Sequence, residues 1–368
     1  MRIFLNKKTQ YLLFILNHDS FKSYLCGCSL INVLFNKRQI YSSADIITTV
    51  PKDILYDILN NDGYSTYAYK NYISVNKYNM TFNISILSDL DDYYEKADFS
   101  TEYLLADYNG NIIDKYNVLN DITTKTIKCI NNIEICFCNK INKLKAIRLI
   151  SELKDFSLDN SVIEYIKTSP VLDRIDKHLI ASEINLLLLG NNVSEALTLL
   201  QQTSLLKSVF PELDRCAGVT QHEFHTKDVY YHIADVVANT EADLILRLAA
   251  LFHDIAKPQC KALDNGKVRF HGHDIASAEM SAKILKSYGY EEDLIKKIYI
   301  LIKYHMKKKQ LSDNELLDMI HECKQADLDV DYIFKLQFAD NAATLVTDRS
   351  GMYYNQYRAK QLLANQLI

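Results

Sequence analysis

Hydrophobic and polar positions follow two different patterns along the chain. Up to about residue 121, short β-rich segments alternate with helical stretches, and Asn109-Gly110-Asn111 supplies a hairpin turn. The strands are predicted at 46–49, 72–74, 81–87 and 111–114, and the helices at 1–20, 30–35 and 100–105. This mixture predicts an α/β domain at the start of the chain.

The second half of the chain follows a helical pattern from about residue 140 to its end. Pro170 and Gly190 mark breaks between helices, and Ser312 with Glu315 forms a capping box at the start of a later helix. A turn-rich stretch around Asn265-Gly266 predicts a small hairpin. We therefore expect an all-α half interrupted by one hairpin.

The composition is typical of a mostly helical protein with a sizeable core. Only 9 Gly and 4 Pro occur among the 368 residues, and hydrophobic residues make up 48% of the chain. The net charge of −4 excludes a protein held on nucleic acid by bulk charge alone. The apolar start resembles a signal peptide but has no small-residue cleavage site, and no apolar run reaches membrane-spanning length. With scattered cysteines expected to be reduced, these features predict a cytoplasmic protein without membrane contact.

Histidines are concentrated in one part of the chain, since seven of the ten lie between residues 222 and 305. The helical pattern places His232 and His305 on apolar helix faces, and His253-Asp254 follows an apolar run. Asp340 lies on the apolar face of a further helix. A single buried histidine is more often a core residue bonded to a carbonyl. Four inward positions on four helices instead favour a divalent metal, which lets imidazoles and carboxylates be buried together.

These residues resemble the H…HD…D signature of the HD metal-dependent phosphohydrolase superfamily. The signature positions are His232, His253-Asp254 within LFHDIAKP, and Asp340 within LQFADNAA. The resemblance implies two divalent ions (Mn, Fe, Co, Ni, Zn or Mg), bridged by Asp254. The implied ligands are His232, His253, Asp254 and Asp340 for the first ion, and Asp254, His273 and His305 for the second.

Two neighbouring assignments leave alternatives open. His271 competes with His273, which is favoured because it stands in the superfamily's G-H-(D/E) context. Lys257 follows the His-Asp doublet by one turn, where the superfamily often keeps a cation that contacts phosphate. We predict Asp254 and Lys257 as catalytic residues, the alternative for Lys257 being a solvated lysine at a helix end.

The first half resembles the head of bacterial tRNA nucleotidyltransferases and poly(A) polymerases, and VFPELDRCAGVTQHEFHTKDVYYH resembles their join to an HD domain. Gly27, Asp45 and Asp98 remain of the head motifs, whereas the matching metal-binding carboxylates are Ser43 and Asn83 here. Nucleotidyl transfer needs carboxylates that hold two Mg²⁺ ions, so we predict that this activity is lost.

The resemblance implies three parts: a degenerate nucleotidyltransferase-like α/β head at 1–138, a helical RNA-binding-like neck at 139–210 and an HD domain helical bundle at 211–368. The predicted function is metal-dependent hydrolysis of phosphomonoesters or 2′,3′-cyclic phosphodiesters in nucleotides or RNA 3′ ends, tRNA included. The alternatives are retained CCA or poly(A) addition and an RNA-binding scaffold with a structural metal. Lys307-Lys308-Lys309 either contacts RNA phosphates or is a solvated helix end that complements the helix dipole. The oligomeric state is left open.

Overall fold

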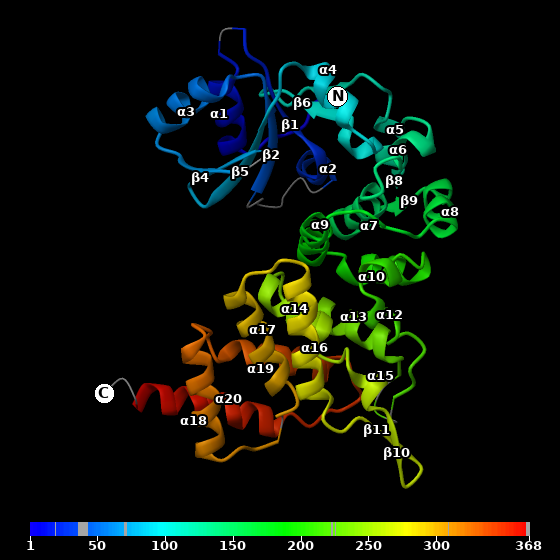
Figure 1. Ribbon diagram of the computed structural model, residues 1–368. Helices are drawn as coiled ribbons and strands as arrows, with labels where there is room; N and C mark the ends of the chain where they lie inside the picture. Colours follow the sequence, from blue (N-terminus) through cyan, green and yellow to red (C-terminus); the bar gives the residue numbers. More distant parts are fainter. Residues whose placement is uncertain are drawn as a thin grey trace. The chain divides into compact units, whose positions relative to one another are not determined.

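The computed structural model describes residues 1–18, 20–35, 43–69, 72–221, 224, 226–307 and 309–365 (Figure 1). The chain divides into two units, one formed by 1–142 with 155–162 and the other by 143–154 with 163–368. The division into head, neck and HD domain stays a prediction. Lys308 lies outside the described residues.

The first unit is built on a seven-stranded sheet with the order β3-β4-β5-β2-β1-β6-β7. β2 and β5 run parallel, and the other neighbours are antiparallel. The strands are β1 Ser23–Cys26, β2 Ser43–Thr48, β3 Ser65–Ala68, β4 Ile73–Lys77, β5 Met80–Ile86, β6 Leu104–Ala106 and β7 Ile112–Asp114. The predicted strands and the hairpin turn, where Gly110 has φ +80°, are confirmed.

Helices flank this sheet, and local capping explains where two of them begin. The side chain of Asn6 accepts a hydrogen bond from the Thr9 N–H, so the first helix starts at Lys7. Gly27, at φ +59°, lets the chain turn from β1 directly into the next helix. The helices are α1 Lys7–Leu16, α2 Gly27–Phe35, α3 Lys52–Asn61, α4 Leu90–Lys96, α5 Leu119–Thr123 and α6 Ile133–Cys136.

The helix predicted at 100–105 is wrong. Ser100–Glu102 forms a single 3₁₀ turn, and β6 begins two residues later. The Glu102 carboxylate accepts the N–H groups of Asp98 and Phe99, which closes the turn on itself. Leu104 is fully buried in the sheet, so tertiary pairing overrides the local helical pattern.

Beyond residue 142 the described chain is almost entirely helical, as predicted. One further strand, β9 Ser157–Leu158, pairs in parallel with β8 Thr126–Ile127, so strands do not end at residue 140. The helices are α7 Asn142–Glu152, α8 Asn160–Thr168, α9 Lys177–Leu189, α10 Val193–Gln202, α11 Leu206–Val209, α12 Pro211–Asp214, α13 Val229–Asn239, α14 Leu244–Phe252, α15 Lys257–Cys260, α16 His273–Ser287, α17 Glu292–Tyr304, α18 Asp313–Gln325, α19 Asp331–Ala342 and α20 Ser350–Asn365.

Local signals in this half also hold. The hairpin is formed by β10 Ala262–Asp264 and β11 Lys267–Arg269, and the capping box of Ser312 and Glu315 starts α18. α14 packs against α13, α16, α17 and α19, and its residues from Leu246 to Phe252 are buried. This packing brings the ends of four helices together around the residue that follows α14. Within the described part of the chain, no helix is long and apolar enough to cross a membrane.

Candidate metal centre

The six predicted metal ligands gather around the end of α14. His232 comes from α13, His253-Asp254 directly follow α14, and Asp340 comes from α19. His273 is the first residue of α16, and His305 directly follows α17. Each of the six side chains is at most 7% exposed, a degree of burial that ionisable groups tolerate only when they are compensated.

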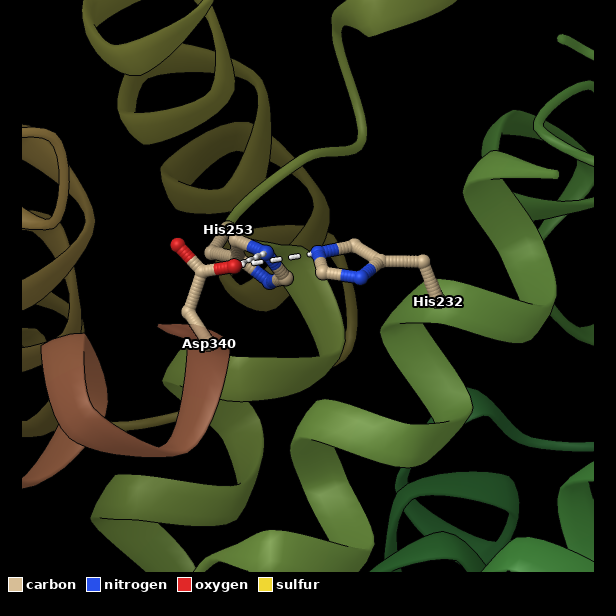
Figure 2. A group of neighbouring side chains, drawn as sticks. All are labelled: His232, His253 and Asp340. Atoms are coloured by element: carbon tan, nitrogen blue, oxygen red, sulfur yellow. Dashed lines mark ion pairs between the residues drawn. The ribbon is translucent and has the colours of Figure 1, made fainter. Parts of the chain in front are cut away.

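The first group of ligand atoms consists of His232, His253 and Asp340, which point toward one another in Figure 2. His232 Nε2 lies 3.1 Å from Asp340 Oδ1, and His253 Nε2 lies 3.9 Å from the same oxygen. The second group consists of Asp254, His273 and His305. In each group the ligand atoms lie within 4.8 Å of one another, so one cation could contact all three.

Asp254 connects the two groups because its two oxygens face different partners. Oδ2 lies 3.1 Å from His253 Nε2 and 3.5 Å from His232 Nε2. Oδ1 lies 3.2 Å from His273 Nε2 and 3.7 Å from His305 Nε2. This carboxylate is therefore placed to contact two cations, one through each oxygen.

Three of the histidines are oriented in the same way. His253, His273 and His305 each direct Nδ1 at the carbonyl three residues earlier, at 2.7, 2.6 and 2.6 Å. A carbonyl can only accept, so Nδ1 carries a proton, and in the neutral imidazole Nε2 presents its lone pair toward Asp254. Both interpretations made from the sequence thus apply to these rings, since one nitrogen contacts a carbonyl and the other is presented to a ligand.

The buried atoms at the centre fit a divalent cation. Among the described residues, Asp254 Oδ1 and the Nε2 atoms of His253, His273 and His305 are buried without a hydrogen-bond partner. Acceptors that face one another at 3–4 Å repel unless a proton or a cation lies between them. Imidazole with carboxylate is the donor set that suits Mn, Fe, Co, Ni or Zn, so the residues fit these five of the six predicted metals.

The same burial changes the protonation of the centre. Burial lowers the pKa of His305 to about 4, so this ring is neutral at pH 7. Burial would raise the pKa of the Asp254 carboxyl, but His253 and Lys257 outweigh it and hold that pKa well below its usual range. Burial opposes protonation of His253, yet the adjacent Asp254 raises the pKa of that imidazole. Asp254 is thus negatively charged, and neighbouring cationic groups compensate this buried charge.

Lys257 is a buried neighbour of this carboxylate, so the alternative of a solvated lysine is wrong. Its side chain is 6% exposed, and Nζ lies 2.6 Å from Asp254 Oδ2. Nζ also donates to Gln221 Oε1 at 2.7 Å and lies 5.4 Å from the centre of the Phe270 ring. No sequence pattern pointed to Gln221 or Phe270, because their contact with Lys257 depends on the tertiary fold.

His271 and His273 are separated by the start of α16. Gly272 has φ +75° and precedes the helix, which turns the two histidines into different environments. His273 is buried in the second group, whereas His271 is exposed. Lys307 and Lys309 are also exposed, and their carbonyl oxygens accept hydrogen bonds from Asn355.

Asp45, one of the residues predicted to remain from the head motifs, has a carboxylate that is already engaged in hydrogen bonds. Asp45 on β2 is paired in register with Asn83 on β5. Ser29 Oγ donates to Asp45 Oδ2 at 2.6 Å, and Asn83 Nδ2 donates to Asp45 Oδ1 at 3.1 Å. Ser43 is exposed at the start of β2. Among the described residues, the only groups of three or more potential metal ligands are the two around Asp254.

The other two head remnants have structural roles. Gly27 supplies the left-handed turn at the start of α2. The N–H of Asp98 donates to the Glu102 carboxylate at 3.1 Å, so Asp98 takes part in a backbone turn. Both residues thus lie at local turns of the backbone in the first unit.

Comparison with known proteins identifies two families within the chain. Residues 222–334 match the HD domain, and residues 155–216 match a family described as the probable RNA- and SrmB-binding site of polymerase A. These matches define a chain with an HD domain, which contains most of the candidate metal ligands, preceded by a region similar to the RNA-binding site of polymerase A.

Individual relatives extend this result. The chain is 24% identical over 273 residues to an A-adding tRNA nucleotidyltransferase of Deinococcus radiodurans, a match that covers 69% of this chain and 61% of that protein. It is 31% identical over 134 residues to a CC-adding tRNA nucleotidyltransferase of Thermus thermophilus, covering 34% of this chain and 31% of that protein. The chain thus spans about three fifths or less of these curated relatives.

Solved structures agree on the fold. The CCA-adding enzyme of Bacillus stearothermophilus in complex with CTP superimposes with a TM-score of 0.62 at 16% identity, over 97% of this chain and 84% of that one. A tRNA nucleotidyltransferase complexed with a primer tRNA and an incoming ATP analogue superimposes with a TM-score of 0.55 at 13% identity, over 97% of this chain and 100% of that one. The chain thus has the fold of the CCA-adding enzymes, carries an HD domain and is similar in sequence to tRNA nucleotidyltransferases.

Proposed function

We propose that this protein is a metal-dependent phosphohydrolase whose activity lies in the HD domain, and that its head no longer transfers nucleotides. The observation that carries the proposal is the joining of two groups of buried ligand atoms through the two oxygens of Asp254. When bound, a pair of divalent cations would supply Lewis acidity toward phosphoryl oxygens and would lower the pKa of water.

The chain's own residues would hold and charge-balance that pair. His232, His253 and Asp340 would hold one cation, His273 and His305 the other, with Asp254 between them. The carbonyl contacts of the Nδ1 atoms keep the rings in one tautomer and orientation, which holds the Nε2 lone pairs ready for a metal.

Lys257 is the residue we expect to meet the substrate. Its ammonium group is held beside Asp254 by Gln221 and by the Phe270 ring, in surroundings that exclude water. Phosphate is recognised by lysine as a point charge, and a buried ammonium attracts it more strongly than a hydrated one. A short movement of Nζ from the carboxylate to a phosphoryl oxygen would serve substrate binding.

Nucleotides or RNA 3′ ends, including those of tRNA, are the proposed substrates. This part rests on the HD resemblance, which implies phosphomonoesters and 2′,3′-cyclic phosphodiesters, and on the matched polymerase RNA-binding family at 155–216. A cytoplasmic location remains the expectation for such a protein.

Retained CCA or poly(A) addition is the second candidate, and the names of the relatives favour it. The head geometry opposes it, because both oxygens of Asp45 already accept hydrogen bonds from Ser29 and Asn83. One carboxylate in this state is a poor holder for two Mg²⁺ ions and a triphosphate.

The decisive experiment compares the two activities in one preparation. Purified protein is given phosphomonoesters, 2′,3′-cyclic nucleotides and tRNA ends with Mn²⁺, Co²⁺ or Ni²⁺, and separately tRNA lacking CCA with Mg²⁺ and labelled CTP or ATP. We expect metal-dependent release of phosphate or opening of the cyclic ester, abolished by EDTA, and no incorporation of label above a control without protein.

Matched variants assign each activity to a domain. Asp254→Ala should abolish hydrolysis, whereas Asp45→Ala should leave it unchanged because the head site lies in the other unit. Robust label incorporation would refute loss of the transferase. Metal-loaded protein without turnover that binds RNA equally well as wild type and as His253→Ala would instead support a scaffold with a structural metal.

A further inference from the structure

A hollow in the first unit has features of a ligand site that the HD chemistry does not use. It lies between the start of α1, the loop after α3 and the β4–β5 hairpin, and its volume is about 350 Å³. Buried Tyr64 and Phe82 line it together with Tyr11 and Tyr78, which are 44% and 67% exposed. A volume of this order accommodates a small organic ligand.

Tyr78 adopts a backbone conformation that its side chain disfavours. It occupies the first position of the β4–β5 turn at φ 55°, followed by Asn79 at φ 58°. This left-handed region is suited to Gly or Asn, whereas a bulky aromatic residue is unusual there. A strained position that carries a largely exposed ring is a reason to look for a ligand.

The start of α1 breaks a second local rule in the same place. Its first turn holds Lys7 and Lys8 and no acidic residue, although the positive end of a helix dipole disfavours cations. Both lysines line the hollow, and Lys8 Nζ donates to the Tyr78 carbonyl oxygen at 2.5 Å. An anion bound here would be favoured by both ammonium groups and by the helix dipole.

Lys77 contributes a third cation, whose ammonium group is already paired. Its Nζ lies 2.7 Å from Asp62 Oδ2, and at 4.7 and 4.9 Å from the ring centres of Tyr64 and Tyr78. Tyr11 Oη donates to Asp62 Oδ1 at 2.7 Å, which fixes the other wall. The aromatic walls are thus held in place, and three lysines against one aspartate leave the hollow with a charge of about +2.

We propose that this hollow binds a nucleotide, whose base stacks on Tyr78 and whose phosphate lies near Lys7 and Lys8 at the start of α1. Aromatic rings beside cations are the elements that bind unpaired bases and their phosphates without reading sequence. An acidic peptide would use the lysines but would not account for the exposed, strained ring. The site is independent of the proposed hydrolysis, and the nucleotide is either free or part of single-stranded RNA.

The test uses the full-length protein in EDTA, so that metal-dependent binding at the HD centre does not contribute. AMP binding is measured by calorimetry, and binding of a fluorescein-labelled ten-nucleotide oligoadenylate by anisotropy. Tyr78→Asn should weaken binding by about 5- to 150-fold, the range that one stacked base represents. The same change should keep or raise the thermal midpoint, because Asn suits the left-handed turn.

Three controls separate stacking from general effects. Tyr78→Phe should bind like wild type, since the ring is kept, and so should Tyr357→Asn, which alters an equally exposed tyrosine on α20. Lys7→Gln should weaken oligoadenylate binding and flatten its salt dependence by about one phosphate contact.

The outcomes distinguish the sources of the ligand. Sensitivity of both probes to Tyr78→Asn supports a site for free nucleotides and RNA alike, and sensitivity of oligoadenylate alone assigns the site to RNA. Equal binding by wild type and Tyr78→Asn, absence of binding to both probes, or full competition by polyglutamate with no effect of Tyr78→Asn would overturn the proposal.

Discussion

The buried ion pair between Asp254 and Lys257 can be tested by removing first one partner and then both, and measuring the free energy of unfolding. In EDTA, Asp254→Ala leaves the Lys257 ammonium group buried without its carboxylate, since these side chains are 2% and 6% exposed. Removing one partner of a buried pair costs about 3–5 kcal/mol of unfolding free energy. Asp254→Ala combined with Lys257→Met should recover most of that loss, because the new side chain has similar length and no charge.

Metal then separates the role of Asp254 as a ligand from its role as an ion-pair partner. At a Mn²⁺ concentration one hundred times the dissociation constant, wild type should gain about 2.7 kcal/mol of stability. The double variant should gain less than half of this, because Asp254 belongs to the second group of ligand atoms and also faces the first. The comparison uses folded proteins of similar stability, so lost metal binding is not confused with lost folding.

The assay is urea unfolding with and without Mn²⁺. Unfolding is followed by far-ultraviolet circular dichroism, because the chain contains no Trp for fluorescence and is largely helical. Elemental analysis of protein purified without chelator should give one or two transition-metal ions per wild-type chain and a clear loss in the double variant. Lys309→Ala, at an exposed position, is the matched control and should change neither result. A double variant that gains as much from Mn²⁺ as wild type would refute the assignment of Asp254.

Three further predictions concern positions that the fold makes critical. Gly289→Ala should lower the thermal midpoint, because a Cβ there would lie 1.8 Å from His178 and the residue has φ +77°, and adding His178→Ala should restore part of the loss. Arg247→Met should cost about 2–3 kcal/mol in urea unfolding, because the buried guanidinium donates to the carbonyls of Leu188 and Gly190. In EDTA, the unfolding free energy of wild type should fall by about 3 kcal/mol more than that of His305→Leu as pH falls from 6.5 to 4. The reason is that His305 takes up a proton in the unfolded chain at a higher pH than in the folded protein. Equal pH dependence of the two proteins would contradict this.

The sequence alone determined features that depend on near neighbours. The capping box at Ser312, the hairpin around Asn265-Gly266 and the helical series after residue 140 are present as predicted. These features form because residues three or four apart, or adjacent in a turn, interact in any context. The family resemblance also came from short motifs, and the named relatives agree with it.

The head shows where local pattern is insufficient. Strands β1, β3 and β6 were not predicted, and residues 104–106 belong to a strand although a helix was expected over 100–105. Each of these strands is three or four residues long and is stabilised by partners elsewhere in the sequence, as Leu25 with Ala106 illustrates. A segment this short carries too little periodicity to distinguish the two structures.

The chemistry of the site was decided at both levels. The sequence supplied the histidines and carboxylates, but only packing shows that His273 is buried while His271, two residues earlier, is exposed. Only the fold brings Gln221 to Lys257 and encloses both oxygens of Asp45 in hydrogen bonds. Side-chain type is fixed by the sequence, whereas burial and distance arise from contacts between residues far apart along the chain, and these set charge, protonation and metal binding.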